Sequence, residues 1–171
     1  MFKKILYFFI FLIAYFIGII LGICDGMEET SFSSSRNSYI ENIFTENKFN
    51  RFISIAKNNV SVGLKNFLLG FFSLGILSLV YSFDNGFVWG FVIGKSTKVL
   101  TIKEILETTI PHCSEIIGIV LMGYLGFILS MRILFNTSII TKKEVSILLG
   151  ISLIIIIISR MSFQLCHELR Q

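Results

Sequence analysis

The chain has 171 residues, 54% of them hydrophobic and 15% charged, with a mean hydropathy of +0.80. A soluble domain of this length needs more polar surface, so the composition predicts an all-α integral membrane protein forming a single domain over residues 1–171. The net charge of +4 is scattered through the loops, which argues against nucleic-acid binding, and the three dispersed cysteines exclude a disulfide framework or a Cys-x-x-Cys zinc site.

The first predicted element is an apolar anchor helix over residues 5–24. Roughly twenty apolar residues are enough to cross a bilayer. The preceding Lys3 and Lys4 favour a cytoplasmic N-terminus. The run is longer than a signal-peptide core and no small-x-small cleavage site closes it, so the helix is expected to be retained. Gly18 and Gly22, four residues apart, would let another helix approach closely.

Residues 25–59 are predicted to form a polar loop followed, from Tyr39, by an amphipathic helix. The loop is acidic and rich in serine. In the following segment the apolar residues fall roughly on one face, which is typical of a helix lying on the membrane or against the bundle. An ordinary solvated linker is the alternative interpretation.

Residues 60–163 are predicted to form the helical bundle. A second span over residues 60–83 is expected to end at Asp84-Asn85-Gly86, because Asn-Gly is the strongest turn signal in the chain. The apolar piece at 87–95 is too short to cross alone. It forms either a re-entrant half-helix followed by an amphipathic helix, or part of one tilted span reaching residue 110. Gly90 and Gly94 indicate close packing in this region.

Two further spans are expected at residues 111–135 and 145–161, which gives a bundle of four to five transmembrane helices. Basic residues at 95–103 favour four crossings and a cytoplasmic C-terminus, whereas basic residues at 132–143 favour five crossings and an external C-terminus. The count slightly favours four.

The most unusual polar residues are His112 and Glu115, at the start of the span that opens with Pro111. Proline suits the first position of a helix, and residues three apart share a helix face. Glu-x-x-His is a metal-binding pattern in helix bundles. Here the order is reversed and the pair is single, so a divalent metal at His112 and Glu115 would need further donors. The candidate donors are Asn66, Asn85, Glu104, Glu107 and His167.

Two metal-free interpretations of the same pair remain open. An imidazole beside a carboxylate is an acid–base pair in which the carboxylate orients the ring. Cys113 is poorly placed as a nucleophile for it, because adjacent helical residues do not face each other. Alternatively, the residues form a structural hydrogen-bond cluster near the headgroups, where a first-turn glutamate is favoured by the helix dipole. Intramembrane ionisable residues are costly and usually functional.

Three motifs together carry a resemblance to a known family. They are LKNFLLG with Asn66, NGFVWGFVIG with Asn85, and IPHCSEIIGIVLMGYLG with His112 and Glu115. In order and spacing they resemble the stage II sporulation protein M family of polytopic bacterial membrane proteins, over about residues 55–135. The family commonly has glycine after Pro-His, where this chain has Cys113, so the resemblance implies no catalytic thiol.

The resemblance implies two alternative functions in the bacterial cell membrane. The founding members belong to a complex that remodels peptidoglycan during forespore engulfment, and these are typically longer. Short relatives are encoded beside circular bacteriocins and are implicated in making or exporting the cyclised peptide. The short length and the Phe/Ile-rich spans fit the second group, by analogy of family.

The expected function is therefore maturation (leader removal and head-to-tail cyclisation) and/or export of a circular bacteriocin. If the chain is itself an intramembrane peptidase and ligase, His112 would act as general base or metal ligand and Glu115 would assist it. Asn66 or Asn85 would then stabilise a developing oxyanion.

The expected partners follow from this function. They are a hydrophobic precursor peptide, the lipid bilayer, other copies of the chain, and an ATP-driven transporter or other membrane proteins. A transporter is expected because the chain has no Walker-type phosphate loop, so a partner would have to supply the energy for export. A non-catalytic scaffold of a sporulation engulfment or cell-wall remodelling complex is the alternative function.

Overall fold

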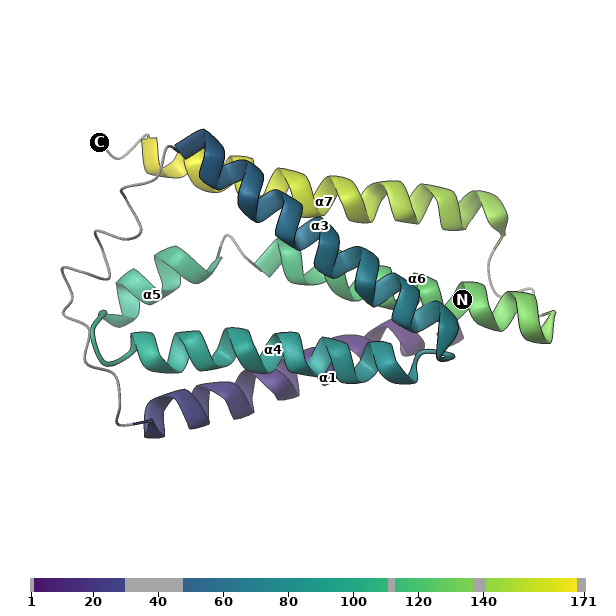
Figure 1. Ribbon diagram of the computed structural model, residues 1–171, viewed down its shortest axis with the longest axis horizontal. Coiled ribbons are helices and arrows are strands. Elements are labelled where there is room, and N and C mark those ends of the chain that lie inside the picture. The colour runs from purple at the N-terminus through teal and green to yellow at the C-terminus, as the bar shows by residue number, and fades with distance from the viewer. Residues whose placement is uncertain (1, 30–47, 111–112, 137–140, 169–171) are drawn as a thin grey trace.

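The computed structural model describes residues 2–29, 48–110, 113–136 and 141–168, and within these ranges the chain is helical with no strand. Five long helices run side by side (Figure 1): α1 Phe2–Glu28, α3 Lys48–Phe72, α4 Ile76–Ser96, α6 Cys113–Phe135 and α7 Lys142–Glu168. A short helix, α5 (Ile102–Thr109), joins α4 to α6. In the described part of the chain, α1 from Ile5, α4 and α6 are long and apolar enough to cross a membrane. The predicted all-α membrane fold is confirmed.

Helix α6 lies at the centre of the bundle and contacts each of the other four long helices (Figure 1). Its side chains Val120, Met122, Leu125 and Ile128 are fully buried. The outer faces of the surrounding helices expose large apolar side chains instead, such as Phe72 at 78%. Apolar surface of this extent on the outside of a bundle marks contact with lipid.

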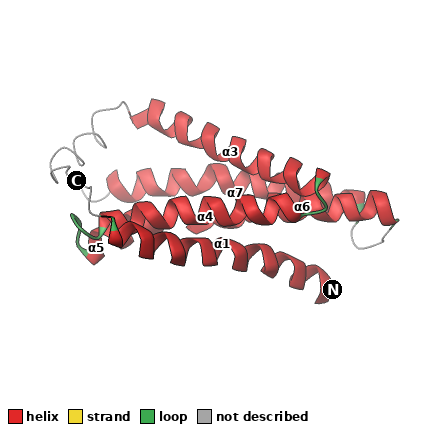
Figure 2. Ribbon diagram, turned by 60° about the horizontal axis from the view of Figure 1, so that its bottom comes forward, coloured by secondary structure: helices red, strands yellow, loops and turns green. Residues whose placement is uncertain are grey.

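Consecutive long helices alternate in direction. Helices α1, α4 and α7 run one way, and α3 and α6 run the other way (Figures 1 and 2). Two pairs of helices that are distant in sequence, α1 with α4 and α3 with α6, therefore pack in parallel.

The parallel pair α1–α4 is packed backbone against backbone. Three glycines of each helix face the main chain of the other, and a Cβ added to any of them would overlap a carbonyl oxygen. These are Gly18, Gly22 and Gly26 against Phe83, Phe87 and Phe91, and Gly86, Gly90 and Gly94 against Tyr15, Ile19 and Ile23. Small residues at this spacing allow membrane helices to approach until their backbones touch. The close packing predicted at Gly18-Gly22 and Gly90-Gly94 is confirmed.

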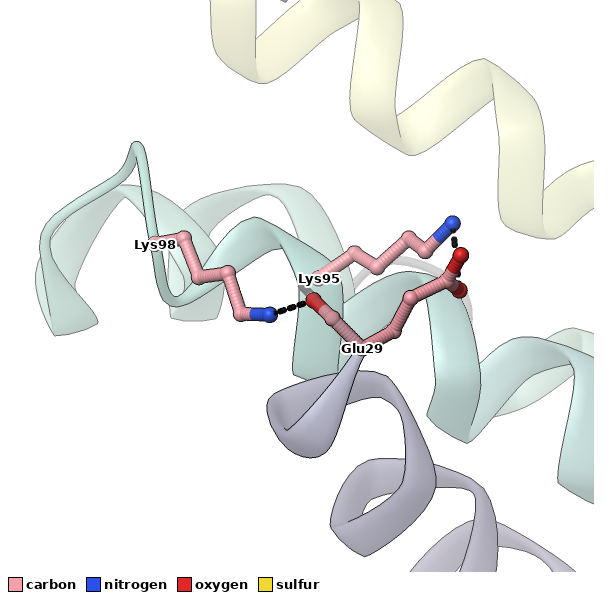
Figure 3. Close-up of polar contacts among 3 residues, drawn as sticks. All are labelled: Glu29, Lys95 and Lys98. Atoms are coloured by element: carbon pink, nitrogen blue, oxygen red, sulfur yellow. Dashed lines mark hydrogen bonds and ion pairs between the residues drawn. The ribbon is translucent and has the colours of Figure 1, made fainter. Parts of the chain in front are cut away.

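Glu29 ties the same two helices together where both of them end. Lys95 Nζ lies 2.8 Å from Glu29 Oε2, and Lys98 Nζ donates to the backbone carbonyl of Glu29 (Figure 3). The Lys95 ammonium also lies 4.6 Å from the centroid of the Phe91 ring. We refer to these contacts as the Glu29 clasp.

The predicted second span over residues 60–83 was wrong. Helix α3 runs without a boundary from Lys48 to Phe72, and the chain then reverses at residues 73–75. Leu74 and Gly75 adopt positive φ values of 53° and 87° in this turn. Residues 48–59, expected to belong to a separate amphipathic helix, are the first half of α3, and residues 39–47 lie outside the described ranges.

The predicted turn at Asn85-Gly86 was also wrong, because both residues lie inside α4. Asn85 Nδ2 donates to the carbonyl of Tyr81 one turn earlier, at 2.7 Å. Gly86 is a packing contact with α1 rather than a turn residue. Residues 87–95 are therefore the second half of a full-length helix, which corrects the re-entrant half-helix. The helix ends at Ser96, which corrects the tilted span to residue 110.

The remaining predicted elements are found close to their expected places. Helix α5 is the amphipathic helix expected beyond residue 95, and a capping box between Thr101 and Glu104 starts it. Helix α6 matches the span expected at 111–135. Residues 145–161 are helical, as part of α7, but α7 is not among the described helices that are long and apolar enough to cross a membrane.

Candidate functional site

A partly open pocket of about 270 Å³ lies between α1, α3, α4 and α6. We call it the Glu115 pocket. Its polar and aromatic lining comes from Tyr15 of α1, Asn58 and Asn59 of α3, Asn85 and Trp89 of α4, and Glu115 of α6. The remaining wall is aliphatic and consists of Val62, Val88, Val92, Ile116 and Ile119. The pocket thus combines one carboxylate, several amides and a branched apolar surface inside an apolar bundle.

Glu115 occupies the first turn of α6, and only 6% of it is exposed. The positive end of the helix dipole favours a negative charge at this position. Asn59 Nδ2 donates to Glu115 Oε2 at 2.7 Å. Burying a carboxylate is costly unless hydrogen bonds and nearby dipoles compensate for lost water. The adjacent amide and the helix terminus supply this compensation.

The two hydrogen-bonded amides of the pocket have a defined orientation. Asn85 donates to a backbone carbonyl and Asn59 donates to a carboxylate. Because these partners accept and cannot donate, the NH₂ group of each amide must face the protein partner. Each amide therefore keeps its carbonyl oxygen as an acceptor and its second N–H as a donor.

Asn66 belongs to a separate buried cluster. Its Nδ2 donates to Ser82 Oγ and to the carbonyl of Ile119, each at 3.0 Å, and Ser78 Oγ donates to its Oδ1 at 2.5 Å. We call these four residues the Asn66 cluster. Both Ser78 and Ser82 are fully buried, as is Asn66 itself. The cluster joins α3, α4 and α6, and Asn66 is not among the pocket-lining residues.

The other candidate residues are spread over the molecule. Glu104 caps α5 by accepting from Thr101 N at 2.8 Å, and Glu107 is exposed on the same helix. His112 and the side chain of His167 lie outside what the structure describes. The predicted His112–Glu115 pair, and a metal bound by it, therefore stay predictions. Within the described residues, no group of three or more His, Cys, Asp or Glu side chains could hold a metal ion.

The structure thus brings Asn85 and Glu115 together and adds residues that the sequence did not single out. These are Tyr15, Asn58, Asn59 and Trp89. Asn58 and Asn59 fall within residues 25–59, which were expected to lie outside the bundle, and the uninterrupted α3 carries them into it. Polar side chains inside a membrane bundle are a signal for function, once the span is placed correctly.

The fold and the pocket define a class of protein: an α-helical membrane bundle with a polar, carboxylate-containing pocket between its helices. Within this class, the model of the family described as stage II sporulation protein M matches residues 7–163, and the chain belongs to this family. The match extends well beyond the segment at 55–135 on which the resemblance was based. No curated protein and no solved structure matches the chain.

Proposed function

We propose that this protein acts in the maturation, by leader removal and head-to-tail cyclisation, and/or the export of a circular bacteriocin. The observation that carries the proposal is the Glu115 pocket, a polar chamber of about 270 Å³ inside an apolar membrane bundle. An apolar precursor peptide partitions into the bilayer, where only an internal pocket offers polar groups to its reacting ends.

The lining of the pocket supports a role in joining peptide ends. Holding two reacting groups in one small volume removes much of the entropic cost of ring closure. A carboxylate such as Glu115 can accept a proton from an attacking amine or orient the base that does so, and His112 is the base that the sequence predicts. Asn85 lines the same pocket. Its carbonyl oxygen can accept from a substrate N–H, and its second N–H is the group that would donate to a developing oxyanion.

The alternation of helix directions is compatible with five crossings for this function: α1, α4 and α6 are long and apolar enough to span a membrane, and α3 and α7 would cross beside them. With Lys3 and Lys4 on the cytoplasmic side, α1, α4 and α7 would run outward and the C-terminus would lie outside. The Glu115 pocket is lined by the first two turns of α6, where this helix would begin its return from the outer side. A peptide processed there would leave toward the exterior, alone or through an ATP-driven transporter.

A purified-protein assay tests the proposal. The protein in lipid nanodiscs is incubated with its precursor peptide, and mass spectrometry follows release of the leader and loss of one water molecule on cyclisation. We expect Glu115→Gln to lower the processing rate about 100-fold, the size of a general acid–base contribution. Asp84→Asn removes a carboxylate that is exposed on α4 and serves as the matched control. Wild-type processing by a folded Glu115→Gln variant would refute the catalytic role.

The alternative is a non-catalytic membrane scaffold for sporulation engulfment or cell-wall remodelling. The Asn59–Glu115 bond favours it, because this bond and the Asn66 cluster both tie helices together and need no substrate. A scaffold would co-purify with cell-wall enzymes and keep doing so after Glu115→Gln. It would process no precursor peptide.

A further inference from the structure

We infer that the Glu115 pocket binds the positively charged amino terminus of a peptide, a primary ammonium group attached to an aliphatic residue. This inference rests on the proposed function and names the part of the substrate that the pocket recognises. In head-to-tail cyclisation the free amino terminus is the nucleophile, so its binding site is the place where the reaction is set up.

The charge of the pocket favours a cation. Glu115 supplies a carboxylate, and no lysine or arginine is among the described residues that line the pocket. A buried carboxylate attracts a cation more strongly than an exposed one, because the surrounding medium screens it less. A peptide carboxylate would be repelled from the same place.

The polar lining of the pocket offers acceptors to a donor. Asn59 and Asn85 each use one N–H on a protein acceptor, and their carbonyl oxygens are not engaged in these two bonds. A primary ammonium carries three donors and no acceptor. It can therefore donate to the carboxylate and the amide oxygens of the residues that line the pocket.

The rest of the lining favours an aliphatic residue behind the ammonium. The pocket holds about 270 Å³ and is walled by valine and isoleucine side chains, which suit a branched apolar side chain. The Trp89 ring is part of the same wall, and aromatic faces attract cations. The combination distinguishes a peptide terminus from a bare inorganic cation, which would gain nothing from the apolar wall.

Calorimetric titration of the protein in nanodiscs tests the inference, with the tripeptide amide Leu-Gly-Gly-NH₂ as probe. Trp89 is the only tryptophan in the chain, so its emission reports whether the probe enters this pocket. We expect saturable binding with a shift in Trp89 emission, and at least about tenfold weaker binding of the N-acetylated probe, which has no charge. Glu115→Gln should weaken binding by a similar factor, Asn85→Ala by less, and Asp84→Asn not at all.

Several results would overturn the inference. They are equal binding of the free and acetylated probes, undiminished binding by a folded Glu115→Gln variant, and a Glu115-dependent emission shift with sodium or potassium chloride but none with the probe. Failure of the proposed function can be distinguished from failure of this inference. A protein that binds the free amine through Glu115 but processes no precursor supports the inference and contradicts the cyclisation proposal, whereas processing without amine selectivity does the reverse.

Discussion

Helix α4 takes part in two regions that differ in how the helices contact each other: one is packed backbone against backbone, and the other is joined through polar side chains. Along α1 it presents glycines, and the two backbones meet without side chains between them. Along α3 and α6 it presents Ser78 and Ser82 to the Asn66 cluster, and Asn85 and Trp89 to the Glu115 pocket. The first region is sealed by the absence of side chains, and the second is held by polar side chains that need partners.

The difference shows how a small membrane bundle can contain a polar site. Lipid provides no hydrophobic force between helices, so the bundle depends on close backbone packing and on interhelical hydrogen bonds. The α1–α4 region supplies close packing, which leaves α3, α4 and α6 to place polar groups. We expect substitutions to have different consequences in the two regions.

The largest effect is expected in the glycine-packed region. Gly90→Ala places a Cβ against the carbonyl of Ile19, where only backbone can move. We expect the free energy of unfolding to fall by about 3 kcal/mol, at the upper end for overpacking. Thermal unfolding in detergent measures it. Gly150→Ala in α7 is the matched control, because its added Cβ meets nothing within 4 Å.

The control should be neutral or stabilising by up to about 1 kcal/mol, since alanine favours helix. Equal stability of the two alanine variants would show that α1 and α4 are not in backbone contact.

A smaller loss of stability is expected in the Asn66 cluster. Asn66→Ala removes the amide that satisfies two serine hydroxyls and the Ile119 carbonyl. We expect a loss of about 2 kcal/mol, because buried polar groups are left without partners. Asn58→Ala changes an exposed asparagine on the same helix and should cost less than about 0.5 kcal/mol. If both variants unfold alike, Asn66 is not a structural residue.

The smallest effect is expected at the Glu29 clasp. Lys95 and Glu29 form a partly exposed ion pair at 2.8 Å, and such pairs contribute about 0.5 kcal/mol. Lys95→Ala should lower stability by this amount at low ionic strength, and the difference from wild type should shrink in high salt. Lys103→Ala, on the exposed face of α5, is the comparison. A salt-independent loss would point to the stacking of Lys95 on Phe91 instead.

The sequence predicted the fold well for helices whose length and apolar composition are set by the thickness of the bilayer. The apolar runs of α1 and α6 were located from length and hydropathy, since bilayer thickness fixes the number of apolar residues. The boundary between α3 and α4 was missed because apolar residues continue through the turn at 73–75, and because Asn85-Gly86 is a strong local turn signal.

Tertiary packing overrode that local signal. A stripe of small residues at four-residue spacing runs through the whole of α4: Ser78, Ser82, Gly86, Gly90 and Gly94, all buried. Such a stripe is typical of one continuous packed helix. It was visible in the sequence and, weighed against the Asn-Gly pair, would have predicted the correct helix.

The site was predicted only in part. Glu115 was identified because an ionisable residue at the start of an apolar span is costly, and Asn85 because it is a polar residue at the predicted end of a span and part of a family motif. Their shared pocket depends on the packing of α4 against α6, and Tyr15 and Asn59 reach it from two further helices. A local sequence pattern does not predict which residues of four different helices line the same pocket.

The most direct test of the contrast between a sealed and a polar region is cysteine labelling in nanodiscs. Cys24, Cys113 and Cys166 are replaced by serine, and a single cysteine is introduced at Asn85 or at Ser82, one turn apart on α4. Asn85 lines the pocket, whereas Ser82 is fully buried. We predict that a water-soluble maleimide labels Asn85→Cys rapidly and leaves Ser82→Cys unlabelled. Equal labelling of the two positions, or faster labelling at Ser82→Cys, would contradict the existence of a water-accessible pocket beside Glu115.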